Sequence, residues 1–157
     1  MPRLDRLPQI LRSTLLTFPA QVNDTAPFAP LQMPLSACRL AIVTTAGLHV
    51  RGDTPFIGGD PTFRIIPSNI SAADVLQSHI SLGFDRTPII RDLNVTFPID
   101  RLRELASGGQ IGGLAPNFYS IIMGAMRETS RIEKETGPAI AERLRNERAD
   151  AALITPT

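Results

Sequence analysis

The stretch RLAIVTTAGLHV at residues 39–50 decides the fold class of this 157-residue chain. Residues 39–45 form a short apolar run rich in β-branched side chains, which is typical of a buried strand. A second run of this kind, AALIT, occupies residues 151–155. Buried strands without polar alternation are characteristic of parallel sheets that are covered on both faces. The sequence therefore predicts an α/β domain with a mainly parallel sheet flanked by helices.

Two helices are predicted between these strands. The first begins at Pro98, which suits an initial helical turn, and ends at Gly108. Its apolar residues share one face: Ile99, Leu102 and Leu105. The second helix follows Thr136, which we expect to cap it. Helical structure is also expected in part of residues 121–135.

The segments nearer the first strand are less regular. Residues 62–66, TFRII, predict a second strand. Ser71 can cap a short helix over residues 72–79. Residues 85–97 are interpreted as a loop with a short strand. We also expect AALIT to be an inner strand, which requires neighbours at both edges.

Residues 1–37 differ from the rest in their proline content. The prolines are Pro2, Pro8, Pro19, Pro27, Pro30 and Pro34. Because proline removes a backbone donor, we expect an irregular, Pro-rich extended arm over residues 1–37, with a short helix near residues 7–16. The α/β domain is predicted to occupy residues 38–157.

The composition restricts the class of function. Lys plus Arg number 16 and Asp plus Glu 15, giving a net charge of +1. That balance predicts neither nucleic-acid nor membrane binding. Cys38 is the only cysteine, so an intrachain disulfide and a cysteine-rich zinc site are excluded, and a cytoplasmic location is expected. An isolated cysteine is interpreted as a small buried hydrophobe. No metal site and no cofactor held by this chain are predicted.

Candidate site residues follow from the expected sheet, because sites in such sheets form beyond the carboxyl ends of strands. His49 follows the first strand and is a candidate acid, base or substrate hydrogen-bonding group. A structural histidine with both ring nitrogens satisfied is the plainer alternative. Arg64 can bind a carboxylate, or pair with Asp60 or Asp92 within the fold.

Asp92 and Asn94 stand just before the predicted helix at Pro98. Asx side chains at such positions often cap turns or helices. Capping is favoured for Asn94, whereas Asp92 is open between capping and chemistry. We expect His49, Arg64 and Asp92 to converge near the carboxyl edge of the sheet.

Six segments occur in an order that resembles a known family. They are IVTTAGLHV (42–50), GDPTFRIIP (59–67), SH (78–79), RDLNVTFPIDRLRELASGGQIGGLAP (91–116), ETGPAIAERL (135–144) and DAALITP (150–156). The order is similar to the N-terminal part of the selenoprotein B family of glycine, sarcosine, betaine and D-proline reductases. The similarity is greatest to the D-proline reductase members.

The resemblance implies a reaction and a set of partners. Such subunits cleave a C–N bond of D-proline, glycine or betaine reductively, with a thiol reductant. A pyruvoyl group on a partner subunit holds the substrate. The residues that match family segments are substrate or interface candidates: Gly47, His49, Arg64, His79, Asp92 and Asn94. Formation of a homo-oligomer is left open.

The resemblance also implies that the family's selenocysteine or cysteine nucleophile is expected just after Thr157. No residue of this chain is assigned as the nucleophile, so the chain alone is expected to be inactive. A UGA codon read as a stop is favoured over a fragment or a decayed gene product. The sheet is then incomplete at its C-terminal end and exposes one edge. The alternative is a non-catalytic small-molecule-binding or interaction module derived from the family.

Overall fold

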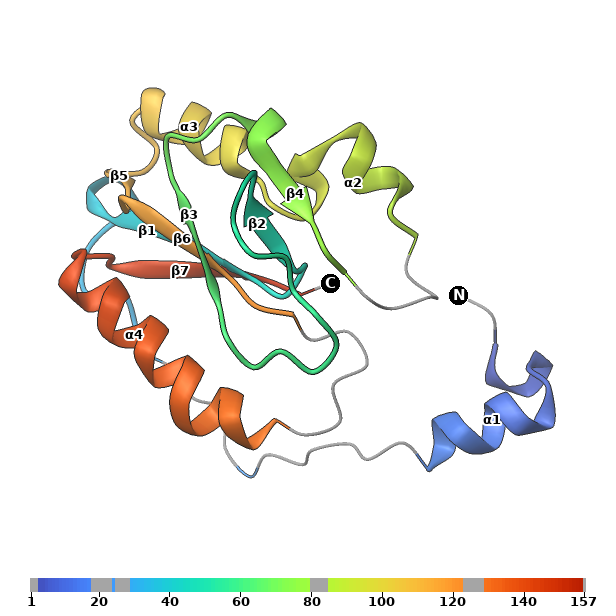
Figure 1. Ribbon diagram of the computed structural model, residues 1–157. Coiled ribbons are helices and arrows are strands. Elements are labelled where there is room, and N and C mark those ends of the chain that lie inside the picture. Colours follow the sequence, from blue (N-terminus) through green and yellow to red (C-terminus); the bar gives the residue numbers. More distant parts are fainter. Residues whose placement is uncertain (1–2, 18–23, 25–28, 80–84, 123–128, 157) are drawn as a thin grey trace. The chain divides into compact units, whose positions relative to one another are not determined.

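The computed structural model describes residues 3–17, 24, 29–79, 85–122 and 129–156 (Figure 1). The chain divides into two compact units, residues 1–30 and residues 31–157. In the first unit, helix α1 (Gln9–Leu16) confirms the helix predicted near residues 7–16. A single 3₁₀ turn, Leu4–Arg6, precedes it.

The second unit is built on a sheet with β1 (Arg39–Thr44) at its centre. Strand β7 (Ala151–Thr155) runs parallel to β1 and pairs with residues 40–44. Because β7 occupies one edge of β1, the other edge is shared by β5 (Gly113–Leu114) and β6 (Asn117–Ser120), both also parallel to β1. Strand β3 (Arg64–Pro67) is antiparallel to β6. The sheet is therefore mostly parallel, as predicted.

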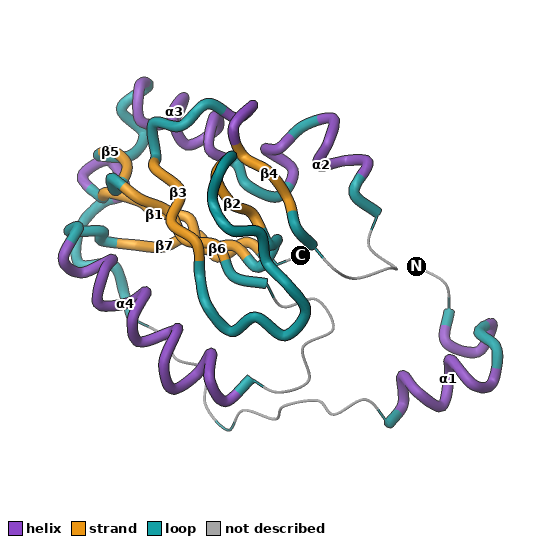
Figure 2. The backbone as a smooth tube through the Cα atoms, in the orientation of Figure 1, coloured by secondary structure: helices purple, strands orange, loops and turns teal. Residues whose placement is uncertain are grey.

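A separate two-stranded ladder stands beside this sheet (Figure 2). It pairs β2 (Leu48–Val50) antiparallel with β4 (Val75–Gln77). His49 lies opposite Leu76 in the register.

Apolar clusters cover both faces of the main sheet. On one face, Phe118 packs with Phe97 and with Leu102 of α3 (Ile99–Ser107), and the two aromatic rings lie 5.7 Å apart. On the other face, Tyr119 packs with Ile140 of α4 (Gly137–Asn146). Neighbouring strand residues point to opposite faces, so Phe118 and Tyr119 anchor the two layers of helix. The predicted α/β class with flanking helices is confirmed.

Most predictions from local pattern are close to the observed elements. Strand β1 ends one residue before the predicted run, and α3 begins directly after Pro98 and ends before Gly108. The strand predicted at residues 62–66 is observed as β3, which starts two residues later and ends one residue later.

The short helix predicted over residues 72–79 is wrong. A 3₁₀ turn, Ala72–Asp74, is followed directly by β4. Ser71 does cap this turn, with its hydroxyl oxygen accepting from the Ala73 N–H at 3.3 Å. Pairing with β2 supplies residues 75–77 with the backbone hydrogen bonds that a helix would otherwise provide internally.

The loop with a short strand predicted for residues 85–97 is also wrong. The segment forms helix α2 (Thr87–Arg91) and a 3₁₀ turn, Leu93–Val95. The Asp85 carboxylate accepts from the Thr87 N–H at 2.9 Å, and a proline lies in the first turn of α2. A local Asx turn and this proline start the helix.

Thr136 was predicted to cap the helix that follows it, and the structure differs on this point. Within residues 121–135, residues 123–128 lie outside the described part. A π-helical turn, Ile132–Thr136, continues directly into α4. The Thr136 hydroxyl donates to the Pro61 carbonyl and does not cap the helix.

Strand β7 runs parallel to β1, as predicted, but its apolar side chains are not buried as its composition suggested. Leu153 is 41% exposed and Ile154 is 67% exposed. Among the described strands, β7 pairs with β1 alone and so lies at the edge of the sheet. The reason is that burial of an apolar strand depends on neighbours, which its own sequence does not specify.

Candidate functional site

Three parallel strands end together at the carboxyl edge of the sheet. Thr44 of β1 lies opposite Ser120 of β6 and opposite Thr155 of β7. The Thr44 hydroxyl and the Thr45 N–H both donate to the Thr155 carbonyl at 3.2 Å. The carboxyl ends of β1 and β7 are therefore hydrogen-bonded to each other.

Gly47 forms the turn that leaves this edge. Its φ of +65° lies in the left-handed region, which favours glycine. Its N–H donates to the Ile121 carbonyl at 3.0 Å, and its carbonyl accepts from the Ser78 N–H at 2.9 Å. A Cβ at this position would lie 3.4 Å from the backbone nitrogen of His79. The turn thus holds the residues after β4 against the carboxyl edge.

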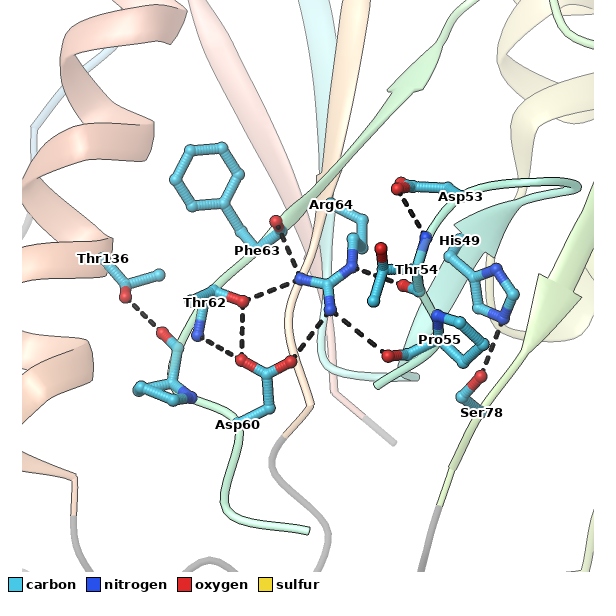
Figure 3. Close-up of polar contacts among 11 residues, drawn as sticks. His49, Asp53, Thr54, Pro55, Asp60, Thr62, Phe63, Arg64, Ser78 and Thr136 are labelled. Carbon is cyan, nitrogen blue, oxygen red and sulfur yellow. Dashed lines mark hydrogen bonds and ion pairs between the residues drawn. The ribbon is translucent and has the colours of Figure 1, made fainter. Parts of the chain in front are cut away.

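His49 lies within β2, rather than in a loop after the first strand, and is only 4% exposed. Its Nδ1 is 3.1 Å from the Val50 carbonyl oxygen, and its Nε2 is 2.7 Å from Ser78 Oγ (Figure 3). Both ring nitrogens therefore have partners. The Ser78 contact spans 29 residues and depends on the β2–β4 ladder, so no sequence pattern predicted it.

His79 directly follows Ser78 in the chain and is 3% exposed. Its carbonyl accepts a hydrogen bond from the Arg86 guanidinium. Burial lowers the pKa of His79, and the positive charge of Arg86 lowers it further. The neutral imidazole is therefore favoured.

Arg64 is held by its own loop. Its side chain is 10% exposed and pairs with Asp60, with 2.9 Å between Nη2 and Oδ2. The guanidinium also lies 4.2 Å from the centre of the Phe56 ring. The remaining acceptors are the carbonyls of Thr54, Pro55 and Phe63 and the Thr62 hydroxyl (Figure 3). Since a guanidinium has five N–H groups, these contacts occupy all of them.

Asp60 is the charged partner in this loop. Burial opposes its ionisation, but hydrogen bonds from Thr62 and Arg64 outweigh that effect, so its pKa lies below the ordinary value. Of the pairings considered for Arg64, the structure selects Asp60. A substrate carboxylate would have to displace one of these acceptors.

Asp92 and Asn94 lie in a different place. They line a groove of about 540 Å³ between β4, α2 and the start of α3. The Asn94 side-chain oxygen accepts from the Asp100 N–H at 2.9 Å, which confirms its predicted capping contact at the start of α3. The Asp92 carboxylate accepts from the Asn94 N–H at 2.9 Å, and hydrogen bonds from Asn94 lower the pKa of Asp92.

The expected convergence of His49, Arg64 and Asp92 in one pocket is not observed. Arg64 lines a shallow pocket of about 480 Å³ with Asp53 and Thr54, and Asp92 lines the separate groove described above. Local hydrogen bonds hold Arg64 and Asp92 in these positions. Among the candidates, Gly47, His49 and His79 gather at the carboxyl edge.

Cys38 lies just before β1, at the amino end of that strand. It is fully buried, and its Sγ is 3.4 Å from the Pro34 carbonyl oxygen. Within the described ranges, no group of three or more His, Cys, Asp or Glu side chains is arranged to hold a metal ion. No helix in the same ranges has the length and apolar character needed to span a membrane.

These features define an α/β domain whose polar groups gather where parallel strands end, a common position for small-molecule sites. The chain belongs to the glycine/sarcosine/betaine reductase selenoprotein B family, whose model matches residues 13–157.

Individual relatives agree with this assignment. The chain is 39% identical over 129 residues to the D-proline reductase subunit gamma of Acetoanaerobium sticklandii, covering 82% of this chain and 52% of the relative. It is 26% identical over 144 residues to the sarcosine reductase complex component B subunit beta of Peptoclostridium acidaminophilum, covering 89% and 33%. It is 27% identical over 143 residues to the glycine reductase complex component B subunit gamma of Carboxydothermus hydrogenoformans, covering 88% and 32%.

The chain thus spans about half the length of the first relative and about a third of the other two. No solved structure matches it.

Proposed function

We propose that this chain forms the N-terminal part of a reductase subunit that cleaves a C–N bond of a small amino acid or betaine with a thiol reductant. D-Proline is the first substrate to test, because the relative with 39% identity is a D-proline reductase subunit. The relatives are named as subunits, which supports a partner protein. In this proposal the partner carries a pyruvoyl group, and both proteins work in the cytoplasm.

The observation that carries the proposal is the meeting of two family segments at one edge of the sheet. The turn after β1 and the end of β7 are joined through Thr44, Thr45 and Thr155. Gly47, His49 and His79 border this edge and are the proposed substrate or interface residues. Arg64, Asp92 and Asn94 remain candidates at the two neighbouring pockets.

The nucleophile is proposed to lie after Thr157, as a selenocysteine or cysteine. The reaction requires an ionised sulfur or selenium atom that can be reached by the substrate. Cys38 does not meet this requirement, because it is 0% exposed and lies at the amino end of β1. A nucleophile that follows β7 would instead stand at the carboxyl edge.

The test compares two proteins in the presence of the pyruvoyl-containing partner and dithiothreitol. One is the 157-residue chain, and the other is extended past Thr157 with cysteine at the next codon. Adding two hydrogens across the Cα–N bond of D-proline gives 5-aminopentanoate, which is measured by mass spectrometry. We expect product only from the extended protein, and Cys38→Ser should not change its rate.

Turnover by the shorter chain that survives Cys38→Ser would overturn the proposed nucleophile. The gene provides an independent result. An in-frame UGA after codon 157, followed by codons that continue the family similarity, supports the proposal. A UAA or UAG codon without such similarity favours the non-catalytic binding module.

A further inference from the structure

Ser78 and His49 form a hydroxyl–imidazole pair next to the carboxyl edge. Ser78 Oγ is 2.7 Å from His49 Nε2, which is a short hydrogen bond (Figure 3). The imidazole is 4% exposed, whereas Ser78 is only partly buried. A ligand at this position would therefore meet the serine hydroxyl first, with the imidazole behind it.

The Val50 carbonyl determines which ring nitrogen accepts the serine proton. A carbonyl oxygen can only accept, so the contact of 3.1 Å to His49 Nδ1 requires a proton on Nδ1. The neutral ring then carries its lone pair on Nε2, where it accepts from the Ser78 hydroxyl. A base oriented by one acceptor and bonded to one hydroxyl has the geometry needed for proton transfer.

The pair is attached to the edge where the parallel strands end. The Ser78 N–H donates to the Gly47 carbonyl at 2.9 Å, and the Gly47 N–H donates to the Ile121 carbonyl at 3.0 Å. The N–H of the neighbouring Leu48 donates to Ser120 Oγ at 2.8 Å. These contacts connect the pair to Ser120, the last residue of β6, and to Ile121, which follows it.

We propose that Ser78 and His49 accept the proton of a small thiol that binds at this edge. The thiol S–H bond breaks as its proton passes to Ser78 Oγ, while the serine proton passes to His49 Nε2. The products are a thiolate and an imidazolium whose Nδ1–H still donates to Val50. Ser78 passes the proton on and His49 is the base that receives it, so both are catalytic residues in this step.

A thiol fits this pair better than an ammonium group does. The ordinary pKa values are about 8.5 for a thiol and above 10 for a lysine-type ammonium, so a thiol gives up its proton more readily. Transfer from a thiol places a thiolate beside an imidazolium, and the attraction between these opposite charges favours the transferred state. Transfer from an ammonium creates no such pair. The thiolate is also the form that reduces disulfides. This inference rests on the thiol reductant of the proposed function, and it assigns that reductant's activation to two residues of this chain.

The experiment uses ¹⁵N-histidine NMR of the full 157-residue chain. Without ligand, His49 should show a protonated, pyrrole-like Nδ1 and a pyridine-like Nε2. Saturating dithiothreitol at constant pH should move the Nε2 resonance toward the protonated position. Its cyclic disulfide has the same carbon skeleton but no S–H group, so it should not produce this shift. His79 serves as an internal control in every spectrum.

Three variants separate proton transfer from folding. Ser78→Ala should abolish the response to dithiothreitol, Ser78→Thr should retain it, and Ser68→Ala should respond as the unmodified chain does. Backbone amide spectra establish that each variant is folded. No Nε2 shift with dithiothreitol, an equal shift with the cyclic disulfide, or an undiminished shift in Ser78→Ala would overturn the inference.

Failure of the proposed function would give a different pattern. If the extended protein and its partner do not convert D-proline, but the thiol-dependent Nε2 shift depends on Ser78, the proton-accepting pair stands and the reductase proposal falls. If turnover occurs, Ser78→Ala in that complex should lower kcat about 100-fold. An unchanged kcat would show that thiol activation does not use this pair.

Discussion

The two edges of the main sheet differ, although both edge strands are short and apolar. At the β3 edge, Ile66 is fully buried in the cluster that contains Phe118, and Ile65 packs against the cluster around Tyr119. At the β7 edge, Ile154 is 67% exposed. The difference shows that an apolar strand is buried by the segments that cover it and not by its composition.

The loop before β3 is held against this edge by hydrogen bonds from Arg64. Arg64 binds the carbonyls of Thr54 and Pro55 and the carboxylate of Asp60, so the residues before β3 are held to the strand itself. No comparable hydrogen-bonded loop is described at the outer edge of β7.

The largest expected difference between the edges comes from the same substitution made at each. Ile66→Ala should lower the free energy of unfolding by about 4 kcal/mol, because it leaves a cavity in a fully packed core. Ile154→Ala should change it by less than about 0.5 kcal/mol, since that side chain is mostly in solvent. Urea denaturation measures both. Equal losses would show that β7 is covered in solution.

The second-largest loss of unfolding free energy is expected when the Arg64–Asp60 ion pair is broken. Both side chains are nearly buried, with exposures of 10% and 12%, so Asp60→Asn should cost about 3 kcal/mol by leaving the guanidinium without its counter-charge. The matched control is Asp74→Asn, which removes the exposed partner of Arg51 and should cost less than about 1 kcal/mol. Similar costs in denaturant titrations would contradict the proposed role of the loop.

The same variant predicts a pH dependence with a definite sign. The pKa of Asp60 is lowered in the folded state, so its ionisation adds stability above the unfolded pKa, and this is lost as the pH falls through the folded value. The difference in stability between the unmodified chain and Asp60→Asn should be constant above about pH 5 and shrink below about pH 4. A difference that persists unchanged to pH 2 would rule out the carboxylate charge as its source.

The smallest effect on stability, with a clear effect on association, is expected at the β7 edge. An open edge strand with exposed apolar side chains favours pairing with other chains, and a lysine there opposes it. Ile154→Lys should leave the unfolding free energy within about 0.5 kcal/mol but shift sedimentation toward a monomer. Ile90→Lys is the control, because Ile90 is 81% exposed but lies on α2. A chain that is monomeric before substitution would remove the basis for this prediction.

Much of the architecture follows from the sequence because it depends on local signals. Apolar β-branched residues define β1, and Pro98 with a regular apolar face defines α3. The capping contacts of Ser71 and Asn94 also follow from neighbouring residues. The family segments could be recognised for the same reason, because each is a contiguous motif.

Tertiary structure decided the features that depend on residues distant in the sequence. Residues 75–77 are a strand because β2 offers a pairing edge, and that pairing brings Ser78 to His49. The sequence alone allowed Arg64 to pair with either Asp60 or Asp92. In the folded chain the loop places Asp60 next to Arg64, and these two residues form the ion pair. The exposure of β7 likewise depends on what lies beyond its outer edge. Local propensity fixes backbone conformation over a few residues, whereas burial and side-chain pairing are set by the packing of the whole chain.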